Sequence, residues 1–164
     1  MLKKIGIAVV IILIVIQFIR PDKNISGDDT FAIATKYSIP NDVENILQVS
    51  CYDCHSNTTT YPWYSNVQPI AWFLAEHVTD GKKHLNFSEF TNKPLFVQNH
   101  KLEETIEMVE EKEMPLPSYT YFGLHQDANL TDLQRDKIMV WANAQMDYLK
   151  QTYPADSLAF PKRN

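Results

Sequence analysis

Cys51-Tyr52-Asp53-Cys54-His55 is the most informative segment of this 164-residue sequence. Two cysteines separated by two residues, with a histidine directly after the second, are typical of a c-type haem attachment site. Each thiol can add to one vinyl group of the porphyrin, and the histidine then falls beneath the iron as its proximal ligand. Cys51 and Cys54 are the only cysteines in the chain. We therefore expect Cys51, Cys54 and His55 to hold one covalently attached haem c.

Two other interpretations of the same five residues stay open. A zinc site would need two further ligands, which would have to come from His77, His84, His100 or His125, at spacings that match no common zinc finger. A thioredoxin-like dithiol needs its cysteine pair at a strand-to-helix junction. The residues just upstream, 42–47, have instead the pattern of a short amphipathic helix. Haem attachment is therefore the favoured interpretation.

The composition limits the class of protein. The chain has a formal net charge of −5, and removing Lys3, Lys4 and Arg20 with the N-terminal segment leaves −8 for the remainder. An acidic domain is poorly suited to nucleic acid, and a basic protein partner suits it better. Glycine occurs only four times, and no segment shows sustained strand alternation. We expect a single all-α domain.

The N-terminus carries an apolar segment. Residues Ile5 to Ile19 are apolar apart from Gly6 and Gln17, and Lys3 and Lys4 precede them. As a helix this core would reach about 22 Å, less than the roughly 30 Å of a bilayer's hydrocarbon layer unless its flanks contribute. No small residues mark a cleavage site after it. We expect residues 1–20 to be an uncleaved signal anchor, a transmembrane helix in the bacterial cytoplasmic membrane that leaves the rest of the chain in the periplasm.

The remaining chain divides into a tether at 21–32, a haem-binding domain at 33–150 and a C-terminal tail at 151–164. Within the domain, four helices are expected, from Pro40 to Val49, from Pro69 to Gly81, from Leu102 to Glu111, and onward from Thr131. Pro69 suits the first position of its helix, and Gly81 suits its end. Thr131 and Gln134 form a capping-box pattern at the start of the last helix.

A second axial ligand for the iron is expected from Met114. It lies in Glu113-Met114-Pro115-Leu116-Pro117, where the following proline keeps Met114 out of helical conformation and stiffens the loop. Other methionines, at 108, 139 and 146, fall in expected helices and are more typical of packing. His77, His84 and His125 remain alternatives to Met114. The aromatic residues Tyr61, Trp63, Tyr64 and Trp72 either line the haem pocket or belong to the core.

Further segments carry a family resemblance. They are Cys51 to Thr58, Tyr61-Pro-Trp-Tyr-Ser, Gln68-Pro69, Trp72, His77, Gly81, Leu85 to Ser88, Met114-Pro115, Tyr119, and Leu130-Thr131 to Trp141. Together they resemble the haem-binding domain family of bacterial exported cytochrome-like proteins over residues 33–148. The Met-Pro loop followed by a capped helix with a tryptophan is also similar to class I cytochromes c. The resemblance implies covalent haem on Cys51 and Cys54, His55 as proximal ligand and Met114 as distal ligand.

These observations favour an electron carrier: a small cytochrome c-like helical domain that exchanges electrons with an unidentified redox partner and needs no catalytic residue. A haem-dependent peroxidase or a gas or redox sensor is the alternative. It requires an open distal position, with a histidine such as His77 or His125 acting on the bound ligand. A membrane-tethered dithiol redox protein is a third, weaker possibility.

Overall fold

The structure of the chain is a computed structural model, and it describes residues 1–120 and 125–161. Within these residues the regular structure is helical, apart from one isolated antiparallel bridge between Ile25 and Thr58. The α-helices are α1 (Leu2–Ile16), α2 (Asn41–Ser50), α3 (Tyr52–His55), α4 (Ile70–His84), α5 (Leu95–Glu110), α6 (Pro117–Thr120) and α7 (Asp132–Thr152). The expected all-α class is confirmed.

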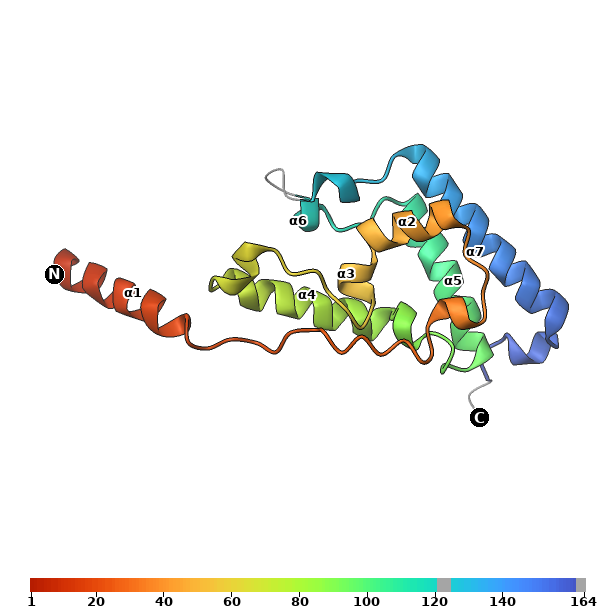
Figure 1. The fold of residues 1–164 in the computed structure, drawn as a ribbon, viewed down its shortest axis with the longest axis horizontal. Helices are drawn as coiled ribbons and strands as arrows, with labels where there is room; N and C mark the ends of the chain where they lie inside the picture. The colour runs from red at the N-terminus through yellow and green to blue at the C-terminus, as the bar shows by residue number, and fades with distance from the viewer. Residues whose placement is uncertain (121–124, 162–164) are drawn as a thin grey trace.

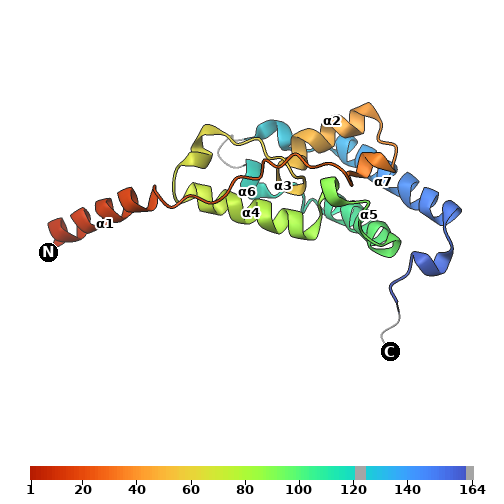
Figure 2. The same cartoon turned by 60° about the horizontal axis from the view of Figure 1, so that its bottom comes forward.

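Two long helices, α5 and α7, pack against each other, while α2 contacts α7 and the single turn α3 contacts α4 (Figures 1 and 2). Their apolar faces meet in one main core, with Leu102 of α5 and Trp141 and Leu149 of α7 all at most 3% exposed. The same core includes Val43 and Leu47 of α2. Because α2 is buried on this face, the cysteine pair that directly follows it has a fixed position.

The last helix begins as the sequence predicts. The Thr131 side chain accepts a hydrogen bond from the Gln134 amide, the Gln134 side chain bonds the Thr131 amide, and the capping box is complete. On α7, Ile138 and Trp141 are buried whereas Leu133 is 67% exposed. The predicted helix after Pro40 is also confirmed, as α2.

Two other helix boundaries differ from the prediction. The helix that follows Pro69 does not stop at Gly81 but continues to His84. The helix expected from Leu102 begins at Leu95, directly after Pro94, which is extended. Its first turns contain Gln98, a buried polar residue that accepts a hydrogen bond from Tyr37. A polar residue at a buried position interrupts the apolar periodicity that predicts a helix, and the start at Leu95 was therefore missed.

The predicted transmembrane helix over residues 1–20 is not supported. The apolar helix α1 has 15 residues, and its core of about 22 Å is shorter than a bilayer's hydrocarbon layer. Among the residues that the structure describes, none of the helices is both long and apolar enough to cross a membrane. None of the residues of α1 is buried, and the helix projects away from the rest of the chain (Figures 1 and 2).

The segment predicted to be a tether, 21–32, is extended and lies along the domain (Figure 1). Asn24 accepts a hydrogen bond from Lys82 of α4 at 2.6 Å, and the Gly27 amide donates to the Asn57 carbonyl. At the other end of the chain, the predicted tail includes the last two residues of α7 and the short 3-10 helix η6 (Ala155–Ser157). Its residues 162–164 lie outside the described residues.

Candidate functional site

The cysteine motif forms one helical turn. Cys51 caps the end of α2, and the amides of Cys54 and His55 both donate to the Cys51 carbonyl, at 3.2 and 3.0 Å. Residues three and four positions apart share one side of a helix. The turn therefore presents both thiols and the imidazole on the same side, as attachment to a single porphyrin requires.

The imidazole of His55 is oriented by the main chain that follows α4. Its Nδ1 atom lies 2.9 Å from the Leu85 carbonyl oxygen. A carbonyl oxygen accepts and cannot donate, so Nδ1 carries the proton and Nε2 keeps its lone pair. Burial lowers the pKa of His55 from its usual 6.5, although the bonds to the Leu85 and Gly81 carbonyls oppose this effect. His55 is therefore held in the neutral form that binds metals.

Gly81 allows α4 to approach the motif closely. A Cβ atom at this position would lie 2.5 Å from the Cys54 carbonyl oxygen and 3.1 Å from the Cys54 Cβ. The first distance is shorter than real Cβ contacts, and its partner is main chain that cannot easily move. The residue predicted to end a helix therefore serves a different purpose, which is the contact between α4 and α3.

Both cysteines are partly buried free thiols. Burial raises the pKa of the Cys51 thiol to about 12 and that of the Cys54 thiol to about 11, with the charges of Cys54 and Asp53, respectively, adding to the effect. Reactive dithiols have lowered pKa values, because the thiolate is the attacking species. These raised values do not support the dithiol redox hypothesis.

The motif opens onto a cavity of about 720 Å³, within the usual range of about 300–1,000 Å³ for cofactor sites. Its wall includes Cys51, Cys54, His55 and Met114, so the structure brings the four predicted site residues together. Apolar side chains from α4, α5 and the loop after α5 complete much of the lining, among them Phe73, Leu74, Val78, Val109 and Leu116.

The three alternative ligands, His77, His84 and His125, also line this cavity, as does Met108, which was expected to be a packing residue. His77 bonds its own helix, with Nδ1 2.8 Å from the Phe73 carbonyl. His125 has its Nε2 2.7 Å from the Tyr64 hydroxyl and stacks on Tyr119, with ring centroids 4.3 Å apart.

The four aromatic residues predicted to line the pocket or belong to the core fall into two groups, the tyrosines and the tryptophans. Tyr61 lines the cavity and Tyr64 contacts His125, whereas Trp63 is 80% exposed and Trp72 is 37% exposed. Neither tryptophan is therefore a core residue.

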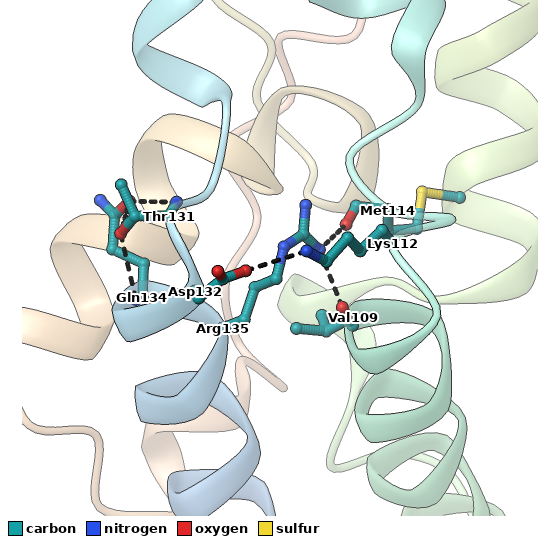
Figure 3. A network of polar contacts seen from close by, with 7 residues as sticks. All are labelled: Val109, Lys112, Met114, Thr131, Asp132, Gln134 and Arg135. Atoms are coloured by element: carbon teal, nitrogen blue, oxygen red, sulfur yellow. Dashed lines mark hydrogen bonds and ion pairs between the residues drawn. The ribbon is translucent and has the colours of Figure 1, made fainter.

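The loop that carries Met114 is fixed through its main chain. The Met114 amide donates to the Met108 carbonyl at 3.1 Å, and the Met114 carbonyl accepts from Arg135 of α7 at 2.9 Å. Arg135 also donates to the Val109 carbonyl at 2.8 Å. Figure 3 shows the Met114 side chain extending away from Arg135. With both main-chain polar groups bonded, the thioether is the part of Met114 left to face the cavity.

A hydrogen bond between Tyr119 and Asp53 joins α6 to the cysteine motif in the wall of the cavity. The Tyr119 hydroxyl of α6 donates to the Asp53 carboxylate at 2.8 Å, and the Thr60 amide donates to the other Asp53 oxygen. Burial, and then the bond to Asp53, raise the pKa of Tyr119 well above its usual value. The Asp53 side chain, inside the cysteine motif, thus bonds the segment just after Met114.

Sequence reasoning missed several residues that build the site: Asp53, Gly81, Leu85, Tyr119 and Arg135. Asn57, just after the motif, is 6% exposed and was also missed. Its side chain bonds the Asp28 carbonyl, Glu89 and Asn86. Apart from the bond between Asp53 and Thr60, these contacts join segments far apart in the sequence, so local spacing assigned none of them a role. Gly81, Leu85 and Tyr119 entered the sequence analysis only through the family resemblance or, for Gly81, as a helix end.

The residues present fit a covalently held haem. They supply two thiols and a metal-binding imidazole nitrogen on one helical turn, a thioether in the same wall, and an apolar cavity of suitable size. The zinc hypothesis finds no support, because within residues 1–120 and 125–161 no three His, Cys, Asp or Glu side chains are grouped to hold a metal ion.

Comparison with protein families agrees with this chemistry. The family model described as "Haem-binding domain" matches residues 11–144, which is most of the chain. Comparisons with curated proteins and with solved structures give no match. The resemblance drawn from the motifs is thus confirmed at the level of the family, and haem binding with it. The chain belongs to the haem-binding domain family.

Proposed function

We propose that this chain is an electron carrier with one haem c, bound covalently through Cys51 and Cys54 and ligated axially by His55 and Met114. The observation that carries the proposal is that all four residues lie in the wall of one cavity of about 720 Å³. When bound, the haem iron would supply reversible one-electron transfer, with its reduced form favoured by histidine and methionine ligation.

The residues of the chain supply the surroundings that such a carrier needs. The Leu85 carbonyl holds the proton of His55 at Nδ1, which fixes the ring and leaves Nε2 for the iron. Phe73, Leu74 and Val78 line the cavity from α4 and would exclude water from the ring. The turn of α3 fixes the two thiols and the imidazole relative to one another. No side chain has to act as acid, base or nucleophile.

The contacts of the cavity wall favour Met114 over His125 as distal ligand. The Nε2 atom of His125 is bonded to the Tyr64 hydroxyl. Met114, in contrast, has both main-chain polar groups bonded and lines the cavity. His77 stays an alternative, because its Nδ1 atom bonds the Phe73 carbonyl and leaves Nε2 able to bind a metal.

A haem enzyme or sensor is the second candidate, and the position of His125 favours it. This histidine lines the cavity beside two tyrosines, where it could act on a ligand bound at an open iron position.

The ferric absorption spectrum of the matured protein separates the two candidates. An electron carrier with Met114 bound is expected to be low-spin, with a weak near-infrared Met–iron band that is lost in Met114→Ala and kept in Met108→Ala. Met108 lines the same cavity from α5 and is therefore the matched control. A high-spin, five-coordinate iron that is unchanged by Met114→Ala would support the enzyme or sensor and exclude our distal assignment.

We also place the haem domain on the periplasmic side of the bacterial cytoplasmic membrane, with α1 associated with that membrane. Lys3 and Lys4 precede the exposed apolar residues of α1, which is the arrangement of an N-terminal export signal and supports this placement. The redox partner is expected to present a basic surface, because Glu76, Asp80, Glu104 and Glu107 lie around the cavity. Protease added to spheroplasts should digest the haem domain, and protection from it would contradict this placement.

A further inference from the structure

We propose that Arg135 and Tyr119 are positioning residues for the distal ligand, and that together they hold the Met114 loop closed over the haem cavity. The proposal deepens the proposed function and rests on it, because it takes Met114 as the sixth ligand of the iron. Neither residue belongs to the attachment motif or touches the iron-binding atoms.

Arg135 fixes the N-terminal side of the loop. Its guanidinium donates from one nitrogen to two carbonyl oxygens, that of Val109 in the last turn of α5 and that of Met114, as Figure 3 shows. A cation is favoured at a helix C-terminus, where the last carbonyls have no partner within the helix. In the part of the chain that the structure describes, none of the ion pairs includes Arg135. Its charge is thus directed at the main chain that carries Met114.

The helix that supplies Arg135 is itself well anchored. Arg135 lies one turn into α7, just after the capping box of Thr131 and Gln134, and its own amide donates to the Thr131 carbonyl. Three residues further on, Ile138 is fully buried. The guanidinium therefore extends from a rigid base, and its two bonds transfer that rigidity to the turn between α5 and the Met114 loop.

Tyr119 fixes the C-terminal side of the loop. It lies five residues after Met114, and its hydroxyl bonds the Asp53 carboxylate between the two attachment cysteines. A hydrogen bond to a charged group is stronger than one between neutral groups. The ring of Tyr119 is also stacked on His125. The loop is thus bonded on one side to α7 and on the other side to the motif that carries the haem.

These two attachments imply that the Met114 loop exchanges between two states. In the closed state Met114 binds the iron, and in the open state it does not. An added ligand such as imidazole can bind the iron only when Met114 has left it, so its apparent affinity is proportional to the open fraction. Loss of either attachment of the loop should increase that fraction about tenfold, which corresponds to about 1.4 kcal/mol. Two independent attachments should combine to about a hundredfold.

The test is the affinity of imidazole for the matured ferric protein, together with the near-infrared Met–iron band. Arg135→Gln and Tyr119→Phe should each bind imidazole about tenfold more tightly than the wild type and show a weaker band. The double variant should bind about a hundredfold more tightly. Arg135→Lys keeps the charge but not the geometry that allows one guanidinium to bond both carbonyls. We expect its affinity for imidazole to lie between those of the wild type and Arg135→Gln.

Two matched controls separate positioning from general loss of structure. Asp147→Asn removes the ion pair with Lys150 near the other end of α7, and neither residue lines the haem cavity. Tyr37→Phe removes a tyrosine hydroxyl that donates to Gln98 in the main core, away from the cavity lining. Both controls should bind imidazole within about twofold of the wild type.

Failure of the proposal can be distinguished from failure of the proposed function. If Met114→Ala leaves the spectrum unchanged, the distal assignment itself is wrong. If Met114→Ala abolishes the band but Arg135→Gln and Tyr119→Phe bind imidazole like the wild type, only the positioning role is overturned. An equal gain of affinity in the two controls would also overturn it, because the effect would then follow from general destabilisation. If Arg135→Gln fails to fold, Arg135→Lys and Tyr119→Phe decide by the same criteria.

Discussion

The Nδ1 atom of His55 lies 2.9 Å from the carbonyl oxygen of Leu85, thirty residues further along the chain. This contact joins the attachment motif to the end of α4. It determines which nitrogen of the imidazole is free, and it depends on the close approach of α4 to the motif at Gly81.

The haem-free chain should therefore contain His55 as the Nδ1-protonated tautomer, with a pKa below the usual 6.5 because of burial. As the pH falls through about 6.5, the unfolded chain takes up a proton at His55 that the folded chain does not. The free energy of unfolding should then decrease, by at most about 1.4 kcal/mol per pH unit from this group. Nitrogen NMR and urea unfolding between pH 5 and 8 measure both effects. A pKa above 6.5, or an unchanged pH slope in His55→Gln, would contradict the assignment.

The two thiols of the folded haem-free chain should react slowly with iodoacetamide. At pH 8 a thiol with the ordinary pKa of 9.0 is about one-tenth thiolate, whereas one with a pKa of about 11, as for Cys54, is about one-thousandth. We expect Cys54 in the Cys51→Ser variant to react about 100-fold more slowly in native buffer than in urea. Cys51 in the Cys54→Ser variant should be slower still. Equal rates with and without urea would show that the thiols are not held as the structure places them.

Gly81→Ala should destabilise the haem-loaded chain. The added methyl group meets the Cys54 carbonyl oxygen at 2.5 Å, and such overpacking costs about 1–3 kcal/mol. Gly6→Ala is the matched control, since its methyl group in helix α1 meets no atom within 4 Å. Urea unfolding should show the loss in Gly81→Ala alone. A Gly81→Ala variant as stable as the wild type would mean that α4 does not need to lie so close to the motif.

Asn57→Ala should loosen the contacts around the motif. The change removes bonds to Asp28, Glu89 and Asn86 from a residue that is 6% exposed, at a cost of roughly 2–3 kcal/mol. It should also speed hydrogen exchange of the Gly27 amide, which donates to the Asn57 carbonyl. Asn143→Ala, which removes one exposed bond on α7, should change stability by less than about 1 kcal/mol. Equal losses in the two variants would argue against a central role for Asn57.

Much of the fold followed from local patterns. The spacing of Val43, Ile46 and Leu47 predicted α2, and the Thr131–Gln134 pair predicted the start of α7, because both signals lie within a few residues. The attachment motif is equally local. Helix α5 was predicted too short, since its first turns bury a polar residue, Gln98, through a bond to the distant Tyr37.

The surroundings of the site could not be predicted in this way. Arg135 has the appearance of an exposed helix residue in the sequence, and only the packing of α7 against α5 brings it to the carbonyls of Val109 and Met114. Gly81 was interpreted as a helix end because a glycine required by close packing has the same local signature as one that ends a helix. The apolar composition of residues 5–19 predicted a transmembrane helix, but α1 has only 15 residues, too few for such a span.

The most direct test of the account is the mass of the denatured chain after expression with haem-attachment machinery. The wild-type chain should carry the added mass of one haem after acid and organic solvent have removed everything held without a covalent bond. Single substitutions of Cys51 or Cys54 by alanine should leave at most one thioether bond, and the double substitution should leave none. A wild-type chain recovered without haem, with both thiols free to react despite active maturation, would contradict the central claim.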